Sequence, residues 1–242
     1  MELLLLSNST APGRGFLEHA LDEIADVLQG RKRLLFLAQA SFEPEQYTRV
    51  MEEALQPLQL EVVSTHAGAD PAAELEHADA VFVGGGNSFR LLNELQQLHL
   101  LESLRTRVRS GMPYLAASAG TNLACPTIRT TNDMPIVQPS SFQALELVPF
   151  QINPHYLDAD PASPHLGASR SQRISEFLVQ NDVPVVALRE GAWLRVSGSS
   201  AIVAGAADSR LFARGVDPVD LASGSDISTL LQTRPRYDTP LS

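Results

Sequence analysis

Residues 115–125 read LAASAGTNLAC, and this stretch determines how the rest of the chain is interpreted. A hydrophobic run from Pro113 to Ala117 stops abruptly at Ser118, and small residues lie on both sides of the serine. A sharp turn from strand to helix needs such neighbours, because the backbone must fold tightly and leave the serine oxygen accessible. The amide of Ala119 would then point to where an oxyanion forms in acyl transfer. The pattern predicts a nucleophile elbow.

The 242 residues are 44% hydrophobic and 19% charged, as expected for a globular protein with a substantial core. No linker rich in glycine or serine divides the chain, so residues 1–222 are expected to form a single α/β domain. Residues 223–242 are polar and contain two prolines. They are expected to form a tail that is partly disordered.

The formal net charge of −10 argues against nucleic acid or an anionic membrane as the main partner, since both require basic patches. The apolar run at residues 3–6 is too short for a signal sequence or a membrane span. The single cysteine rules out an internal disulfide. These features predict a cytoplasmic protein, and they leave open whether it is a monomer or a homodimer.

Short apolar runs alternate with segments of helical periodicity over the first half of the chain. Strands are expected at residues 3–6, 34–37, 60–63, 80–83 and 113–117. Between them, helices are expected at residues 16–28, 45–55, 71–77, 89–95 and 101–108. This alternation predicts a mainly parallel sheet with helices on both faces, whose sites lie at the carboxyl ends of the strands. Later strands at residues 185–188, 193–196 and 202–204 are expected near the sheet edge, with a helix at residues 169–179.

A nucleophilic serine needs a base and a carboxylate that orients the base. His155 is the preferred base because it follows an apolar strand and the preceding Pro154 restricts the backbone; His165, in a proline-containing loop, is second. Glu190 follows the apolar run at residues 185–188, which favours it as the orienting carboxylate. Asp133 remains the alternative, since spacing alone does not decide between them.

The sequence GGGN at residues 84–87 also follows a predicted strand. Its glycines could direct a backbone amide toward an oxyanion or a phosphate, and the serine elbow favours the oxyanion. The stretch does not match the GxGxxG pattern of dinucleotide sites. No group of histidine, cysteine and acidic residues has metal-ligand spacing, so neither a metal nor a cofactor is expected.

Several of these stretches, in order from residue 1 to about residue 205, resemble the peptidase E family of α-aspartyl dipeptidases. The matching stretches are LLLLSNST at residues 3–10, VGGGN at 83–87, ASAG at 117–120, NLACPTIRTTNDMPI at 122–136, INPH at 152–155, and Glu190-Gly191 with Trp193. The resemblance implies a serine peptidase with a flavodoxin-like three-layer sandwich, similar to class I glutamine amidotransferases. It implies hydrolysis of small Asp-Xaa peptides through an acyl-enzyme, without a cofactor.

Carried over to this chain, the resemblance implies a Ser118–His155–Glu190 triad. Gly86 and Ala119 would supply the oxyanion amides. Arg170 would hold the aspartyl carboxylate of the substrate, which a planar guanidinium can bind with two hydrogen bonds. Asn87, in the glycine-rich turn, is a further expected substrate contact.

Two residues depart from the family pattern next to the nucleophile. Ala116 replaces a glycine and Ala117 replaces a bulky aromatic residue, so a wider pocket and relaxed substrate choice are expected. Two alternatives therefore stay open: a cyanophycinase-like hydrolase of β-aspartyl-arginine peptides, and a related dipeptidase with relaxed specificity. A non-enzymatic relative is disfavoured because all three triad residue types are present.

Overall fold

Five parallel strands form one half of the larger sheet. The computed structural model describes residues 1–65, 70–159 and 167–240, and in it the eight strands of this sheet run in the order β12-β9-β8-β1-β5-β4-β2-β3. The five parallel strands are β1 Glu2–Leu6, β2 Arg33–Leu37, β3 Glu61–Ser64, β4 Ala80–Val83 and β5 Tyr114–Ala117. The other three are antiparallel: β8 Ala192–Ser197, β9 Ser200–Gly205 and β12 Ser225–Asp226. The expected mainly parallel sheet is confirmed for the first half of the chain.

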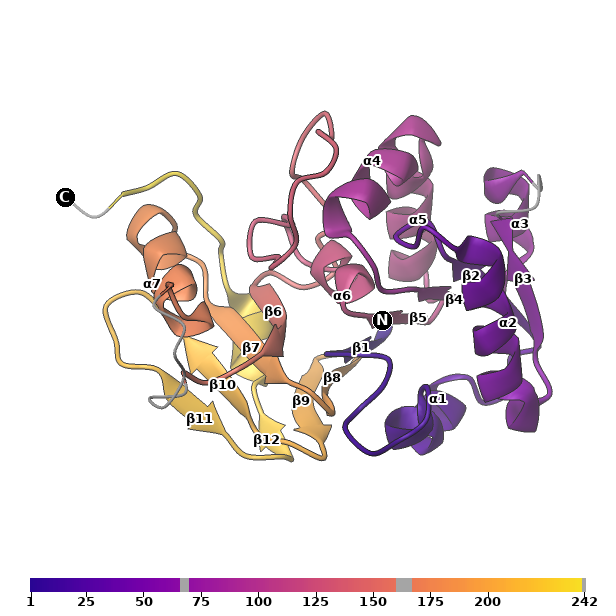
Figure 1. The fold of residues 1–242 in the computed structure, drawn as a ribbon, viewed down its shortest axis with the longest axis horizontal. Helices are drawn as coiled ribbons and strands as arrows, with labels where there is room; N and C mark the ends of the chain where they lie inside the picture. The colour runs from indigo at the N-terminus through magenta and orange to yellow at the C-terminus, as the bar shows by residue number, and fades with distance from the viewer. Residues whose placement is uncertain (66–69, 160–166, 241–242) are drawn as a thin grey trace.

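Helices cover both faces of this sheet, as the apolar runs predicted. One face packs against α1 Leu21–Val27 and α2 Pro44–Leu55, and its buried strand residues include Leu4, Phe36 and Phe82. The other face packs against α3 Pro71–His77, α4 Ser88–Gln97, α5 Leu100–Arg109 and α6 Ala119–Leu123. Successive residues of each strand therefore point into different cores. The result is a three-layer α/β sandwich (Figure 1).

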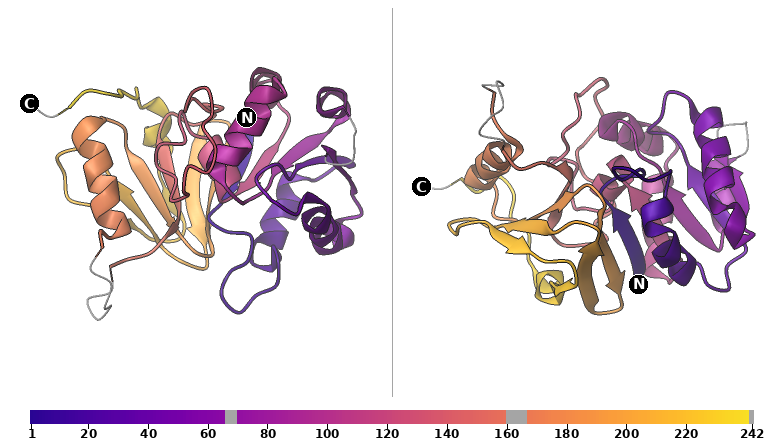
Figure 2. Two further views of the ribbon diagram at one scale, coloured as in Figure 1. Left: turned by 45° about the horizontal axis from the view of Figure 1, so that its top comes forward. Right: turned by 60° about the horizontal axis from the view of Figure 1, so that its bottom comes forward.

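A second sheet of four strands was not expected from the sequence. Its order is β11-β10-β7-β6, formed by β6 Gln151–Tyr156, β7 Val185–Arg189, β10 Ser209–Phe212 and β11 Val219–Leu221. Helix α7, Arg170–Gln180, packs on one face of it, and Figure 2 shows this half beside the parallel half. The expected position of the later strands near the sheet edge is confirmed for β9, which pairs with the edge strand β12, and wrong for β8. β8 lies inside the large sheet between β1 and β9, and β7 lies inside the second sheet.

Two helices begin at different residues than the hydrophobic periodicity predicted, and each difference has a local cause. The helix expected over residues 16–28 begins only at a short 3-10 turn, Glu18–Ala20, because Leu17 has a left-handed backbone (φ 57°). The helix expected over residues 169–179 begins at Arg170. Ser169 caps it, since its hydroxyl accepts a hydrogen bond from the Gln172 amide and the Gln172 side chain accepts one from the Ser169 amide. Two further 3-10 turns are Gln56–Leu58 and Ser228–Gln232.

The segment expected to be a partly disordered tail has a defined place in residues 223–240. β12 pairs with β9, and Ile227 is buried in the core shared with the large sheet. The last two residues lie outside the described part of the chain.

Within the described part, no helix is long and apolar enough to cross a membrane.

Candidate active site

Ser118 lies at a strained turn between β5 and α6. Its backbone has φ 53° and ψ −109°, a region that non-glycine residues rarely adopt. Gly120 allows the helix to approach the sheet, because a Cβ there would lie 2.3 Å from the carbonyl oxygen of Val83. The Ser118 amide donates to the carbonyl of Leu6 at 3.1 Å, which fixes the turn against the end of β1. The structure thus has the elbow that the small residues predicted.

A chain of two hydrogen bonds leads away from the serine oxygen. Ser118 Oγ lies 2.9 Å from His155 Nε2, and His155 Nδ1 lies 3.1 Å from Glu190 Oε1. The imidazole and the carboxylate are both partly exposed, with 36% of the His155 side chain and 38% of the Glu190 side chain accessible to solvent. This geometry allows a proton to move from the hydroxyl to an imidazole whose other nitrogen is held by a carboxylate.

His155 lies within β6, although the sequence placed it just after a strand. Its φ is 53°, and the pairing of β6 with β7 is irregular between Asn153 and Tyr156. The irregularity changes the local direction of the strand and so re-aims the side chain. The second candidate base, His165, lies outside the described residues.

Ser7 and Asn8, directly after β1, make hydrogen bonds that position both His155 and the turn after Glu190. The sequence alone did not predict these contacts. The buried hydroxyl of Ser7 accepts a hydrogen bond from the His155 amide at 2.8 Å and donates to the carbonyl of Leu188 at 2.9 Å. The side-chain oxygen of Asn8 accepts from the Gly191 amide at 2.8 Å. The polar stretch directly after an apolar strand was the available signal, because polar side chains buried there need partners.

Asp133 has other partners. Its Oδ2 accepts hydrogen bonds from the Ser88 amide and the Ser88 hydroxyl, both at 2.7 Å, and from the Thr131 hydroxyl at 3.0 Å. These contacts fix the segment after Thr130 to the start of α4. The structure therefore places Glu190, not Asp133, beside His155.

Successive amides of the glycine-rich turn can be accounted for one by one. The Gly84 amide donates to the Leu37 carbonyl at 2.9 Å, and the Asn87 amide donates to the Ala40 carbonyl at 3.0 Å. The Gly85 amide donates to the Tyr47 phenol oxygen at 2.9 Å. Among the residues that the structure describes, only the Gly86 amide of this turn has no acceptor. Gly86 is exposed, so its unpaired amide is accessible and can donate to a ligand.

The turn lies directly against the nucleophile. A Cβ on Gly85 would lie 3.2 Å from the Ser118 Cβ, so the two residues are in contact. Gly86 has φ 138°, and a Cβ there would lie 2.2 Å from the Ala40 carbonyl oxygen, so no larger residue fits. On the other side of Ser118, the amide of Ala119 belongs to the first turn of α6, where amides have no acceptor within the helix.

Arg170 is the first residue of α7 and lines a cavity of about 730 Å³ with Asn132 and Asp158. Burial lowers the pKa of its guanidinium and the neighbouring Arg173 acts in the same direction, while the charges of Glu190 and Asp133 oppose them. In the described ranges of the chain, 1–65, 70–159 and 167–240, no carboxylate lies within ion-pair distance of Arg170. A half-buried cation of this kind can bind an anionic ligand.

Asn87 is used within the protein. Its side-chain oxygen caps α4 by accepting from the Arg90 amide at 3.0 Å, and its nitrogen donates to the Met134 carbonyl at 2.9 Å. The second hydrogen of that nitrogen and the second lone pair of the side-chain oxygen are still available for a substrate. Substrate binding by Asn87 stays a prediction.

The Ala117 side chain points away from the site. It is fully buried in the core beneath α1 and α2, and it does not line the cavity beside Ser118. The pocket expected to widen at this position is therefore not formed by Ala117.

Cys125 is buried as well, and burial raises the pKa of its thiol to about 12, which makes it a poor nucleophile.

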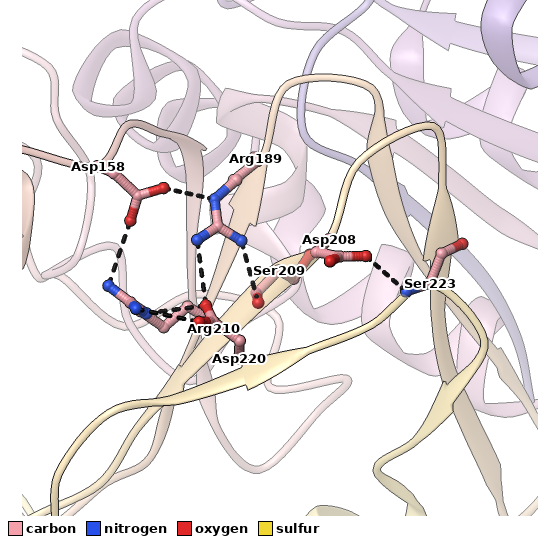
Figure 3. Close-up of polar contacts among 7 residues, drawn as sticks. All are labelled: Asp158, Arg189, Asp208, Ser209, Arg210, Asp220 and Ser223. Carbon is pink, nitrogen blue, oxygen red and sulfur yellow. Dashed lines mark hydrogen bonds and ion pairs between the residues drawn. The ribbon is translucent and has the colours of Figure 1, made fainter.

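Four charged side chains, those of Asp158, Arg189, Arg210 and Asp220, are joined by hydrogen bonds at the ends of neighbouring strands (Figure 3). Arg189, at the end of β7, donates to Asp158 at 2.7 Å and to Asp220 at 3.1 Å. Arg210 on β10 donates to the same two carboxylates at 3.2 Å and 3.0 Å. Asp158 follows β6 and Arg189 directly precedes Glu190, so this cluster joins the two segments that carry His155 and Glu190.

Comparisons with known proteins agree with this architecture. Residues 3–204 match the model of Peptidase family S51. Peptidase E of Streptomyces coelicolor is 56% identical over 239 residues, covering 99% of this chain and 98% of that protein. Peptidase E of Salmonella paratyphi A is 48% identical over 227 residues, covering 93% and 99%.

A solved structure of a peptidase from an acI-B1 actinobacterium has the same fold, with a TM-score of 0.71 at 14% identity over 93% of this chain and 96% of that one. The family match and the two full-length relatives are enough to assign the chain. It belongs to Peptidase family S51 and is a serine-type dipeptidase.

Proposed function

We propose that this enzyme hydrolyses dipeptides with an N-terminal aspartate through an acyl-enzyme on Ser118. The observation that carries the proposal is the hydrogen-bonded series Ser118 Oγ–His155 Nε2–His155 Nδ1–Glu190, with distances of 2.9 Å and 3.1 Å. The strained backbone of Ser118 supports it, since strain of this kind clusters at functional sites.

In the first step, His155 Nε2 accepts the hydroxyl proton while Ser118 Oγ attacks the carbonyl carbon of the scissile peptide bond. The tetrahedral oxyanion is stabilised by the amides of Gly86 and Ala119, and Glu190 orients the imidazolium through Nδ1–H. His155 then gives its proton to the leaving nitrogen, and the C–N bond breaks. Water, deprotonated by the same imidazole, attacks the ester and releases aspartate.

Arg170 is proposed to bind the side-chain carboxylate of the aspartate. Its half-buried guanidinium, which has no ion-pair partner in the described part of the chain, supports this role. A matching carboxylate would gain two charge-assisted hydrogen bonds there. Asn87 is retained as a predicted second contact.

We further propose a cytoplasmic location, for which the single, unpaired Cys125 is the support.

The proposal is tested with a dipeptide panel and a serine-reactive covalent probe, followed by intact mass. The parent is expected to cleave Asp-Leu and to gain one probe adduct, whereas β-Asp-Arg is expected to be a poor substrate. Ser118→Ala should lose nearly all activity and the adduct while it retains the parent's circular dichroism spectrum. Cleavage of Asp-Leu by Ser118→Ala at the parental rate would remove the nucleophile assignment.

A further inference from the structure

The cavity beside Ser118 has no assigned occupant. Its volume is about 520 Å³, and it is lined on one side by Ser118, His155 and Gly86. Arg170 lines a different cavity, and the two cavities share no lining residue. If the aspartyl carboxylate lies at Arg170, the other half of a dipeptide extends from the scissile bond into the first cavity.

One part of the wall of this cavity is formed by apolar and aromatic side chains. Phe16 comes from the loop after β1, and Tyr47 and Val50 come from α2. The rings of Phe16 and Tyr47 meet edge to face with centroids 5.9 Å apart, and Tyr47 packs against Phe36 in the same way at 5.0 Å. These walls can cover an aliphatic stem, and each fully buried methylene group contributes about fourfold to binding.

Among the described residues that line the same cavity, Glu43 is the one acidic side chain, and none is a lysine or an arginine. Glu43 directly precedes α2 but its side chain does not cap the helix. No ion pair involves its carboxylate in the part of the chain that the structure describes. The nearby Arg90 is engaged elsewhere, with its guanidinium 4.5 Å from the centroid of the Phe42 ring.

We propose that this cavity binds the side chain of the leaving residue and selects residues whose apolar stem ends in a positive charge. The inference rests on the proposed function. Lysine and arginine fit both features: the stem lies along Phe16, Tyr47 and Val50, and the cationic end lies near Glu43. An acidic leaving residue would place a like charge at the same point.

The experiment compares kcat/KM for Asp-Ala, Asp-norleucine, Asp-Lys and Asp-Glu. Norleucine has the stem of lysine without the charge, so the ratio of Asp-Lys to Asp-norleucine isolates the electrostatic contribution. For an exposed ion pair this ratio should be about two- to fivefold at low salt and should fall as salt is added. Asp-norleucine should exceed Asp-Ala by about tenfold or more.

Glu43→Gln should bring the Asp-Lys to Asp-norleucine ratio close to one. Glu45→Gln is the matched control, because Glu45 lies exposed in the first turn of α2, two residues from Glu43, and does not line the cavity. A Val50→Ser variant should lower kcat/KM for Asp-norleucine more than for Asp-Ala.

The inference is overturned if Asp-Ala is cleaved as fast as Asp-norleucine and Asp-Lys, or if both glutamine variants change the ratio equally. In either case cleavage of the Asp-dipeptides would still support the proposed function. Absence of cleavage of every Asp-dipeptide would instead contradict the proposed function itself.

Discussion

Ser118 and His155 both have a positive φ of 53°, which costs free energy in a residue with a side chain. Strain at one such residue is of order 1–3 kcal/mol. Both are held by the same place in the fold: the Ser118 amide donates to the Leu6 carbonyl, and the His155 amide donates to the Ser7 hydroxyl. The end of β1 therefore fixes nucleophile and base relative to each other, although 37 residues separate them in sequence.

The choice between Glu190 and Asp133 can be tested by removing one charge at a time. Glu190→Gln should lower kcat by ~10²-fold or more, because the amide cannot stabilise the imidazolium. Asp133→Asn should leave most of kcat, since Asp133 contacts Ser88 and Thr131, and should mainly lower the Tm. Steady-state kinetics with Asp-Leu and thermal unfolding of both variants provide the measurement. A larger loss of kcat in Asp133→Asn would make Asp133 the orienting group.

Tyr47 decides which amide of the glycine-rich turn is available to an oxyanion, because its phenol oxygen occupies the Gly85 amide. Burial raises the pKa of Tyr47, so the phenol stays neutral at pH 7. Tyr47→Phe keeps the ring and removes the acceptor. It should lower kcat by about tenfold, part of the effect of one oxyanion donor, and change KM by less than about twofold.

The control for that variant is Ser9→Ala, because the Ser9 hydroxyl lies 3.5 Å from the same phenol oxygen and, among the described residues, does not hydrogen-bond to the glycine-rich turn itself. Ser9→Ala should retain the parental kcat. Equal loss of kcat in the two variants, or a change in KM alone for Tyr47→Phe, would contradict the role of the phenol.

The residues that touch one another at the site were largely predictable, because Ser118, His155 and Glu190 each follow or end an apolar run. Ser7, Asn8 and Tyr47 were not, since their tasks depend on partners far away in sequence. A hydrophobic pattern reports which side of an element is buried, but it does not report which distant polar group a buried hydroxyl meets.

At the scale of elements, the parallel strands were predictable and the second sheet was not. Continuous apolar runs such as residues 3–6 are typical of strands buried on both faces. The strands β7, β8, β9 and β10 follow one another closely in sequence, yet β8 and β9 join the large sheet while β7 and β10 join the small one. The choice of sheet depends on pairing with β1 and β6, which no local pattern encodes.

The cluster of Asp158, Arg189, Arg210 and Asp220 should stabilise the folded chain more at neutral pH than at acidic pH. Hydrogen bonds from Arg189 lower the pKa of Asp158, so its carboxylate is bound more strongly in the folded chain than in the unfolded chain. Its contribution is complete above the unfolded pKa of about 4 and is lost as the pH falls through the lower, folded pKa.

Asp158→Asn should therefore lower the free energy of unfolding by about 1 kcal/mol at pH 7, and by less at high salt or at pH 3. Urea denaturation at these conditions measures it, with Asp217→Asn as the control, an exposed aspartate in the turn between β10 and β11. A loss that is the same at pH 3 and pH 7 would show that the charge of Asp158 is not its cause.

At the scale of the whole molecule, one core joins the two sheets. Leu3 and Ala116 from the parallel strands belong to the same buried cluster as Ile152 and Val186 from the second sheet and Ile227 from the segment after residue 222. This continuity supports the prediction of a single domain, which would unfold in one transition.

The segment after residue 232 makes hydrogen bonds to Arg129 and to residues directly after α7. Asp238 accepts two hydrogen bonds from Arg129, at 2.8 Å and 3.2 Å, and its amide donates to Asn181. The Thr239 carbonyl accepts from Arg214 at 2.6 Å. These contacts fix the stretch around Arg129, which leads to Thr130 and Asp133 at the site, against the start of the segment after α7.

Two truncations separate the parts played by this C-terminal region. A chain ending at residue 232 keeps β12 and Ile227 and loses the contacts of Asp238, so it should fold with a Tm lower by about 4 °C or more. A chain ending at residue 222 also removes the strand that pairs with β9 and uncovers Val203 of the shared core, and it should lose its cooperative unfolding transition. Calorimetry of the two chains beside the parent gives both results. If the chain ending at residue 222 unfolds like the parent, the core ends before residue 223 and the last twenty residues are dispensable for the fold.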